Sequence, residues 1–461
     1  GRLRAGHRLP GTRALAALLR VQRLTVVAAF DELVAEGWIV TQPARGAIVS
    51  PDIPEPSPAR GTARGIPRRA LFDLAAAPPG EMPYDVPRGG LLFAPNRPDV
   101  RLVPTEMIAR AYRRALRSGG DVLLGYGRPQ GHERLRAAIA AMLASTRGMA
   151  VTADDVCVTR GSQMAVALLA RALIRPGDVV GVEELTYTQA VETFRLAGAR
   201  IVPLALDGEG VRIDALEQVL ASAPMRAVYL TPHHQCPTTV TLSTARRIRL
   251  LELARKHRFA VIEEDYDHEF HYDAAPVLPL ASADRWGVVV YVGTFSKVLA
   301  PGLRIGYLVA PPPLLEAVAA HRLYLDVQGD RVMESALADL MERGEVQRHI
   351  RRMRREYARR RDVLTAALRR QLPRELTFEV PSGGIGIWTR AAEGIDIDAW
   401  SRKAREHGAV FVTARAFSVR SGALPFARLG FAALNQEELV EGVRRLARAR
   451  RALDAKSALP S

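Results

Sequence analysis

The stretch "GTFSKVLAPGLRIGY" (Gly293–Tyr307) decides how the larger part of this chain is interpreted. One lysine, Lys297, stands among small residues directly after the apolar run "VVVYV". A lysine at the end of a buried strand is poorly solvated, which lowers its pKa and favours a Schiff base with an aldehyde. Thr294, Ser296 and Arg304 add two hydroxyls and a guanidinium suited to a phosphate. We therefore expect a site for a phosphorylated aldehyde, against the alternative of an ordinary surface lysine.

A second stretch, "TRGSQMAV" (Thr159–Val166), is typical of a turn from a strand into a helix. The amides of residues 161–163 and the Ser162 hydroxyl would lie at the helix N-terminus, where unpaired N–H groups and the helix dipole attract anions. Many helices begin in this way. The stretch therefore indicates an anion site only in combination with Lys297.

The stretch "VIEEDYDHEF" (Val261–Phe270) places a strand end in an acidic cluster with a tyrosine. A carboxylate there suits a protonated pyridine nitrogen, which would make the ring an electron sink. A metal site and a solvated turn are the alternatives. The histidines show no good ligand spacing, so we expect no metal site. Tyr187 in "EELTYTQA" is suited to stacking on an aromatic cofactor or to packing in the core.

Composition limits the classes of protein further. The chain of 461 residues has a net charge of +16, which attracts polyanions. No apolar run reaches the ~18–20 residues of a membrane span, and we expect a cytoplasmic protein. The two cysteines, Cys157 and Cys236, exclude a disulfide framework and a cysteine-based zinc site. The densest basic run, "RRMRREYARRR" (Arg351–Arg361), is interpreted as a solvated helix face, with a nucleic-acid contact as the alternative.

Residues 1–50 read as one small unit. Apolar residues recur at helical spacing in "TRALAALL" (Thr12–Leu19), with Thr12 as the expected N-cap. "RLTVVAAFDELVAEG" predicts a second helix that ends at Gly37. "WIVTQPARGAIV" predicts two short strands around a turn at Pro43–Gly46. Helix, turn, helix and hairpin form the winged helix-turn-helix pattern of DNA-binding domains.

Residues 51–70 carry five prolines and two glycines with little apolar content, which predicts a linker. From residue 71 to 461, helical segments alternate with short apolar strands such as "DVVGV", "RAVYL" and "VVVYVGT". That alternation predicts an α/β domain with a mostly parallel sheet.

The order of these elements resembles the fold-type I pyridoxal-phosphate aminotransferases. With the winged helix in front, nearly the whole chain resembles the MocR-type regulators of the GntR family. The most specific matching stretches are "YGRPQGHERLR", "TRGSQMA", "TPHHQCPT", "IEEDYDHEF", "GTFSKVLAPGLRIGY" and "ARLGF". The resemblance implies an α/β fold, with an N-terminal winged helix-turn-helix linked to an aminotransferase-like domain, and pyridoxal 5′-phosphate as cofactor.

The resemblance also implies roles for individual residues. Lys297 would form the Schiff base with the cofactor, and Arg428 would bind the carboxylate of an amino-acid or amine effector. The carboxylate at the pyridine nitrogen is Asp265 by residue type and Glu264 by the family's Asp-x-Tyr spacing. The other cofactor contacts would be Ser162, Gln163, Thr294, Ser296 and Arg304 at the phosphate end, Tyr187 on the ring, Tyr266 at O3′, and Tyr126 at the phosphate of the partner subunit in a homodimer.

Four positions depart from the family pattern. Leu185 replaces a proline, Thr239 a glycine, Arg128 an acidic residue, and Cys236 an aromatic residue or asparagine. These changes affect the O3′ side of the cofactor and leave the lysine and the phosphate-binding residues intact. We therefore expect slow or absent transamination.

The N-terminal unit departs from its family as well. Arg20 and Gln22 stand where glycine and serine are usual, and Gln is a poorer N-cap than Ser. The sequence begins at the loop leading into the family's second helix, so we expect either a truncated chain or an impaired module, with a dimerisation appendage as the alternative. The residues that match DNA-contacting positions, the last beside the wing glycine, are Arg13, Arg23, Thr25 and Arg45.

Three functions fit these features. The favoured one is a transcriptional regulator that binds double-stranded operator DNA and uses its pyridoxal-phosphate domain as effector sensor and dimeriser. The second is an aminotransferase with a vestigial N-terminal module, and the third is a pyridoxal-phosphate reservoir. The winged helix and the proline-rich linker favour the first, because a free-standing aminotransferase needs neither.

Overall fold

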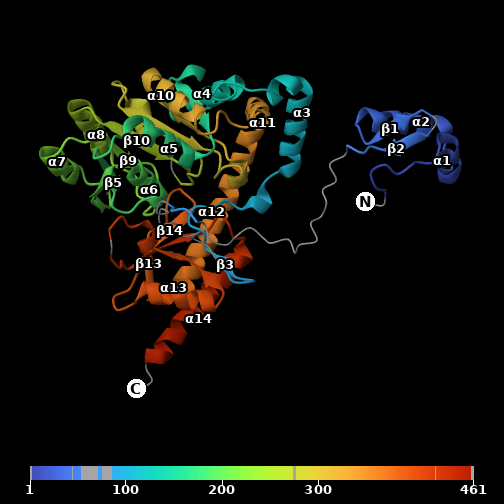
Figure 1. The fold of residues 1–461 in the computed structure, drawn as a ribbon. Helices are drawn as coiled ribbons and strands as arrows, with labels where there is room; N and C mark the ends of the chain where they lie inside the picture. The colour runs from blue at the N-terminus through green and yellow to red at the C-terminus, as the bar shows by residue number, and fades with distance from the viewer. Residues whose placement is uncertain are drawn as a thin grey trace. The chain divides into compact units, whose positions relative to one another are not determined.

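The protein divides into two compact units, Gly1–Ala77 and Pro78–Ser461, which are described separately (Figure 1). Residues 53–70 of the expected linker lie outside the described residues. Within the described part of the chain, no helix is long and apolar enough to cross a membrane. The computed structural model describes residues 3–43, 45–52, 71–74, 86–273, 277–420 and 422–457.

The N-terminal unit has the expected order of two helices and a hairpin. The hairpin is antiparallel, with Ile39 opposite Val49. The prediction that Thr12 caps the first helix is wrong, because Thr12 is already its first helical residue and Gly11 occupies the cap without a side-chain hydrogen bond. The elements are α1 (Thr12–Leu19), α2 (Arg23–Ala35), β1 (Ile39–Gln42) and β2 (Gly46–Val49).

The larger unit is built on a seven-stranded sheet in the order β4-β12-β11-β10-β9-β5-β6. All neighbouring pairs are parallel except those of β12, which runs antiparallel to both β11 and β4. The expected mostly parallel sheet is confirmed. The strands are β4 (Val156–Thr159), β5 (Val179–Glu183), β6 (Arg200–Leu204), β9 (Ala227–Leu230), β10 (Ala260–Asp265), β11 (Val289–Thr294) and β12 (Gly306–Val309).

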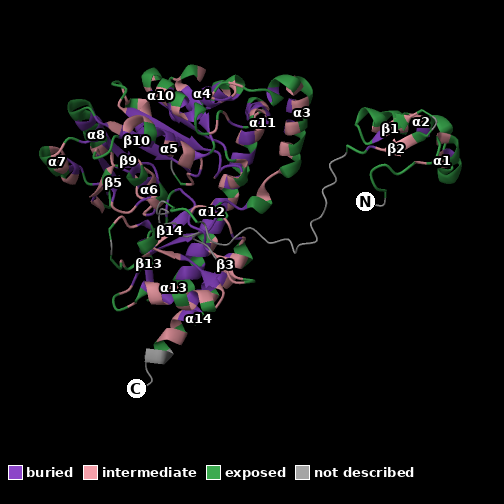
Figure 2. Ribbon diagram, in the orientation of Figure 1, coloured by how far each residue is buried: buried purple, intermediate pink, exposed green. Residues whose placement is uncertain are grey.

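Helices cover both faces of this sheet. Successive side chains of a strand point to opposite faces, so Ile262 packs with α5, α6 and α10, whereas Val261 packs with α7 and α8. In Figure 2 the strands β9 and β10 are coloured as buried, and the outer helices α7 and α8 carry much exposed surface. These helices are α5 (Ser162–Leu173), α6 (Thr188–Leu196), α7 (Ile213–Ser222), α8 (Thr244–His257) and α10 (Pro312–Leu323), and further elements of this lobe are α3 (Thr105–Leu124), α4 (Glu133–Arg147), β7 (Leu206–Asp207), β8 (Gly210–Val211), α9 (Leu280–Ala283) and α11 (Arg331–Glu342).

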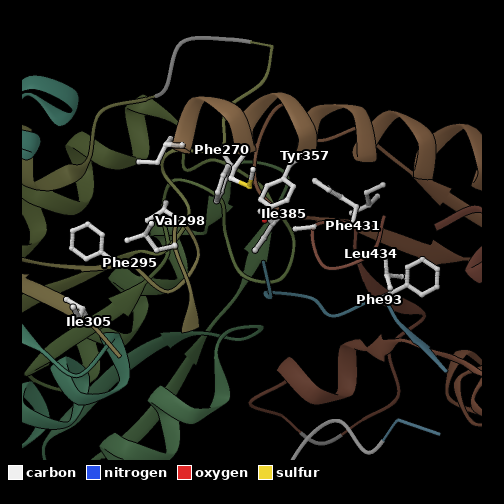
Figure 3. Close-up of a cluster of buried hydrophobic side chains, with 14 of the residues drawn as sticks. Phe93, Phe270, Phe295, Val298, Ile305, Tyr357, Ile385, Phe431 and Leu434 are labelled. Atoms are coloured by element: carbon white, nitrogen blue, oxygen red, sulfur yellow. The ribbon is translucent and has the colours of Figure 1, made fainter. Parts of the chain in front are cut away.

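A long helix, α12 (Glu345–Gln371), joins this lobe to a second, smaller sheet in the order β13-β14-β17-β16. One hydrophobic cluster runs through both lobes, and Figure 3 shows Tyr357 of α12 beside Phe270, with ring centroids 5.1 Å apart. This shared core holds the strand ends of the two lobes in fixed positions. The remaining elements are β3 (Leu91–Leu92), β13 (Leu376–Phe378), β14 (Gly386–Ala391), α13 (Ile397–Glu406), β15 (Ala409–Val410), β16 (Val412–Thr413), β17 (Phe426–Gly430) and α14 (Gln436–Ser457).

Candidate cofactor and effector site

Three strand ends meet where the sequence predicts the phosphate site. The register pairs Thr294 of β11 with Gly306 of β12, and Gly306 in turn with Thr159 of β4. Thr294 Oγ1 lies 3.0 Å from Ser296 Oγ. A side chain at Gly306 would come within 2.9 Å of the amide nitrogen of Ser162. The hydroxyl pair therefore lies in the same region as the N-terminus of α5.

The turn into α5 has the form of an anion cradle. Gly161 is the N-cap of α5, with φ at +81° and no side-chain hydrogen bond to the cap. A Cβ atom there would come within 2.7 Å of the Arg304 guanidinium, which donates to the carbonyl of Arg160 at 2.8 Å. Helix N–H groups, two hydroxyls and one guanidinium thus gather around one point, as a phosphate dianion requires.

Lys297 follows β11 and is half-buried. Burial lowers its pKa below the usual lysine value, and the carboxylate of Glu264 acts in the opposite direction. A lower pKa leaves more of the amine neutral and nucleophilic near neutral pH. The electrostatics therefore suit covalent attachment of an aldehyde.

The two candidate carboxylates at the end of β10 face opposite sides of the sheet. Glu264 points to the side of Lys297, accepts a hydrogen bond from the Tyr229 hydroxyl and contacts the Ser162 side chain. Burial raises the pKa of Glu264, and its hydrogen bonds and the Lys297 charge oppose that rise. Its neutral form is consequently more accessible than that of a solvated glutamate.

Asp265 points away from Lys297 into a separate charged group. Its Oδ2 accepts a hydrogen bond from Tyr291 at 2.6 Å and lies 3.1 Å from His268 Nδ1 and 3.7 Å from Arg147 Nε. Burial alone would raise the pKa of Asp265, but His268 and Arg147 lower it well below the usual range. Asp265 is therefore held as a structural anion behind the site.

The loop at 231–239 forms the side of the site that departs from the family pattern. The Cys236 Sγ accepts from Asn96 at 3.4 Å, and burial raises the pKa of this thiol. Thr239, in place of glycine, has φ at +66°, a conformation that strains a β-branched residue. Tyr266, whose phenol the resemblance places at O3′, donates instead to the carbonyl of His234 at 2.9 Å.

Arg428 lies on β17 and is fully buried. Its guanidinium donates to the carbonyls of Pro95 at 3.1 Å and Pro237 at 2.6 Å and lies 3.4 Å from the Tyr266 hydroxyl. Burial is the largest single influence and lowers its pKa, but Tyr266, Cys236 and Asp267 together outweigh burial and raise the pKa above the usual arginine value. Arg428 is thus a permanent cation between the two lobes, positioned mainly by backbone carbonyls.

Three further residues expected to contact the cofactor differ in how deeply they are buried. Tyr187 is the half-buried N-cap of α6. The side chain of Gln163 donates to Thr193 at 2.7 Å, while its Oε1 is buried without a partner among the described residues. Tyr126 is 88% exposed.

A cavity of about 600 Å³ lies beside the Arg428 strand, between the two lobes. Trp388 and Phe426 stack in its wall with ring centroids 5.3 Å apart, and Leu185 and Thr238 line the opposite side. Trp388 also packs against Cys236 and Tyr266. The cavity therefore shares a wall with the site and has room for a small molecule.

Comparison with known proteins connects this geometry to a family. Residues 91–446 match the family of Aminotransferase class I and II, and residues 1–49 match the bacterial regulatory proteins of the gntR family. The probable rhizopine catabolism regulatory protein MocR of Rhizobium meliloti is 33% identical over 100% of this chain and 92% of its own length. The chain belongs to the MocR-type regulators of the GntR family. The regulator is also similar to TauR of Rhodobacter capsulatus, with 30% identity over 98% of the chain and 93% of that protein.

The aminotransferase-like domain has enzymes among its relatives. The 2-aminoadipate transaminase of Thermus thermophilus is 33% identical over 79% of the chain and 91% of that protein. A crystal structure of LysN, the α-aminoadipate aminotransferase of the same organism, has a TM-score of 0.74 and 33% identity, covering 80% of this chain and 94% of that one. These relatives cover about four fifths of the chain, whereas the two regulators cover nearly all of it.

The cofactor of the regulator is pyridoxal 5′-phosphate, and the residues present fit it. The cradle of Gly161, Arg304 and the hydroxyl pair suits the phosphate, Lys297 suits the aldehyde, and the orphaned Gln163 oxygen lies at the same helix end. When bound, the cofactor supplies an electron-accepting ring for reactions of amines. The protein would contribute Lys297 as the anchor, Glu264 as a carboxylate on the lysine side and Arg428 as a buried cation for a second anion.

The expected DNA-contacting residues all lie on the surface of the N-terminal unit. Arg23 and Thr25 stand in the first turn of α2, the position from which a recognition helix reads base edges. Arg13 lies on α1, and Arg45 lies in the turn of the hairpin. Arg20, between α1 and α2, has φ at +53°, a left-handed conformation that a glycine would adopt without strain.

Several residues of the site are absent from the sequence-based prediction. Tyr229 contacts Glu264, and Tyr291 and Arg147 hold Asp265. Trp388 lies directly opposite Arg428 in the small sheet. Tyr229 and Tyr291 are in strands that the sequence predicts. The register pairs Tyr229 with Ile262 and Tyr291 with Glu263, successive residues of β10, so the two tyrosines face opposite sides of the sheet.

Proposed function

We propose that this regulator senses an amine-bearing carboxylate with its aminotransferase-like domain and transmits the signal to operator DNA. Lys297 holds the cofactor, and Glu264, rather than Asp265, pairs with the pyridine nitrogen. Arg428 binds the effector carboxylate in exchange for its carbonyl partners. We also propose that the regulator is a cytoplasmic homodimer in which Tyr126 reaches the partner subunit's cofactor.

The observation that supports this proposal most strongly is the position of Arg428. Arg428 is fully buried, and its hydrogen bonds go largely to the backbone carbonyls of Pro95 and Pro237. Carbonyls do not neutralise the guanidinium charge, so a bound carboxylate would be stabilised at this position. Pro95 lies in the segment between β3 and α3, and Pro237 lies in the loop at 231–239 that forms one side of the site. A carboxylate that takes these hydrogen bonds would release both loops, which links effector binding to a rearrangement of the domain.

Slow transamination is part of the same proposal. Transamination requires repeated proton transfers on a ring held in one geometry. The Cys236 thiol is a weaker hydrogen-bond donor than an asparagine amide, and Thr239 holds a left-handed conformation in place of a glycine, so both changes alter the O3′ side of the site. The alternative function, an aminotransferase, is favoured by the intact lysine and by the enzymes similar to the larger unit.

An absorbance titration tests the proposed site. Purified regulator with added pyridoxal phosphate is titrated with a panel of amino acids and amines, and the protein is then reduced with borohydride and mapped by mass spectrometry. We expect the label on Lys297 and a saturable spectral change with one class of ligand. A label elsewhere, or none, would refute the assignment of the site. Continuous formation of oxo-acid product would favour the enzyme.

A further inference from the structure

The basic run on α12 separates into two groups of arginines in the structure. One group faces inward and has its hydrogen-bond and ion-pair partners within the fold. Arg360 pairs with Asp99 at 3.0 Å and Glu356 at 2.8 Å, and Arg354 donates to the carbonyl of Glu269 at 3.0 Å. The inward group also contains Arg361, which pairs with Asp273 and Asp362.

The other group faces solvent. It consists of exposed arginines spaced three or four residues apart, and we call it the α12 arginine stripe. The one ion pair in it joins Arg359 to Glu356 at 3.9 Å. The other four have no hydrogen bond or ion pair with any described residue. The stripe comprises Arg348, Arg351, Arg352, Arg355 and Arg359.

The positive charges of the α12 arginine stripe repel one another, and few acidic side chains lie near enough to offset that repulsion. Like charges four residues apart on a helix destabilise it by roughly 0.2–0.5 kcal/mol per pair, and the stripe contains three such pairs. Glu356, the nearest acidic residue of the same segment, is already engaged by the inward Arg360 at 2.8 Å. The fold thus pairs the inward arginines and leaves four of the five outward ones without an ion pair to any described residue, as expected of a surface that binds a polyanion.

We propose that the α12 arginine stripe is a second DNA-contacting surface, which binds phosphates beside the half-site read by the winged helix. This inference rests on DNA binding by the N-terminal unit. From Arg348 to Arg359 the stripe is about 16 Å long, at ~1.5 Å per helical residue. Double-stranded DNA carries about ten charges over that length, at one per ~1.7 Å. A single row of guanidiniums with little base-reading chemistry beside it suits backbone contacts rather than sequence readout.

The chain between the two units is long enough for one DNA molecule to reach both. Residues 53–77 lie between the last described residue of the hairpin region and Pro78, where the larger unit begins. A chain of that length spans at most about 80 Å when fully extended, at ~3.3 Å per residue. The stripe therefore adds contacts to DNA that flanks the half-site and makes no demand on its sequence.

The test compares two full-length variants of equal charge. In the stripe variant Arg348, Arg351, Arg352 and Arg355 are each replaced by Gln, a good helix former. The control variant carries the same substitution at four exposed arginines of other elements, Arg171, Arg200, Arg258 and Arg285. Binding to the upstream region of the regulator's own gene is measured by fluorescence anisotropy at several salt concentrations, and the bound DNA is footprinted with hydroxyl radicals.

We expect the stripe variant to lower the slope of log K against log salt by about three to four units per bound protomer, since each phosphate contact contributes ~0.9. Protection of flanking DNA should disappear while protection of the half-site remains. The control variant should behave as the wild type does.

Equal slopes for the two variants would overturn the proposal, because net charge alone would then explain the effect. Loss of dimers in the stripe variant by light scattering would also overturn it, because the stripe would then be an interface between copies. So would loss of binding to phosphatidylserine–phosphatidylcholine vesicles with an unchanged DNA slope. Failure of the wild type to distinguish its upstream region from unrelated DNA would instead refute the function of the N-terminal unit.

Discussion

Neutralising Glu264 and neutralising Asp265, each in its own variant, should have different consequences: the first should affect the cofactor and the second should affect stability. Glu264→Gln removes the acid on the Lys297 side and keeps an oxygen that can accept from Tyr229. Asp265→Asn removes an anion that contacts Tyr291, His268 and Arg147 on the face of the sheet opposite Lys297. The first change should alter the bound cofactor, and the second should destabilise the fold.

The magnitude follows from the partners that remain. Breaking a buried ion pair costs about 3–5 kcal/mol when the other charge is stranded. Arg147 keeps Glu269 at 2.5 Å, and Asn can still accept from Tyr291, so we expect the lower end, about 3 kcal/mol. The unfolding entropy of a unit as large as Pro78–Ser461 is about 0.8 kcal/mol/K, at ~2.1 cal/mol/K per residue, which makes the loss a fall of about 4 °C in Tm. Glu264→Gln should change the stability of the apo protein by less than about 1 kcal/mol.

Two measurements on each variant decide the matter. Scanning calorimetry of the apo protein gives the Tm, and an absorbance titration with pyridoxal phosphate gives the spectrum and the Kd of the cofactor. We expect Asp265→Asn to lower the Tm with an unchanged cofactor spectrum, and Glu264→Gln to shift the spectrum and raise the Kd. The reverse pattern would refute our placement of the two carboxylates, and the pyridine partner would then be Asp265.

Three further outcomes are expected. Burial lowers the pKa of Lys297 and Glu264 raises it, so the rate of cofactor attachment should rise with pH with a midpoint below the usual 10.5, and the midpoint should be lower still in Glu264→Gln. Stopped-flow absorbance at several pH values measures this midpoint, and a higher midpoint in the variant would contradict the expectation. Thr239→Gly relieves a left-handed threonine and should stabilise the apo protein by about 1 kcal/mol, a rise of about 1 °C in calorimetry, whereas a lower Tm would show that φ at +66° is not strained. Arg428→Lys should weaken amino-acid-induced spectral changes at least tenfold without changing the Kd of the cofactor, because a bidentate contact is lost; identical titrations would refute the role of Arg428.

The sequence predicted the elements and left the orientation of single side chains open. The winged helix and the mostly parallel sheet follow from local periodicity, which is written into the chain at each segment. The Thr12 cap failed because a helix boundary depends on one residue's dihedral angles, and a glycine preceded it. The period of two in "AVIEED" (residues 260–265) already places Glu264 and Asp265 on opposite faces, but only the packing of α5 tells which face holds the lysine.

Long-range contacts account for the rest. The guanidinium of Arg428 meets Pro95 and Pro237, which are 333 and 191 residues away along the chain. The run of arginines on α12 is uniform in sequence, yet Asp99 and Asp273 pair with arginines of one face, while four arginines of the other face have no ion pair with a described residue. Neither arrangement has a local signature, because both arise when distant segments fold onto one another.

The central claim is that a ligand at the Lys297 site changes how the winged helix binds DNA. Fluorescence anisotropy of upstream DNA, measured with holo regulator in the presence and absence of the ligand that changes its spectrum, tests this directly. We predict that the ligand changes the Kd for DNA about 5–150-fold in the wild type, the usual range of allosteric coupling, and leaves the Kd of Lys297→Ala unchanged. An equal change in both proteins, or no change in the wild type at saturating ligand, would contradict the claim.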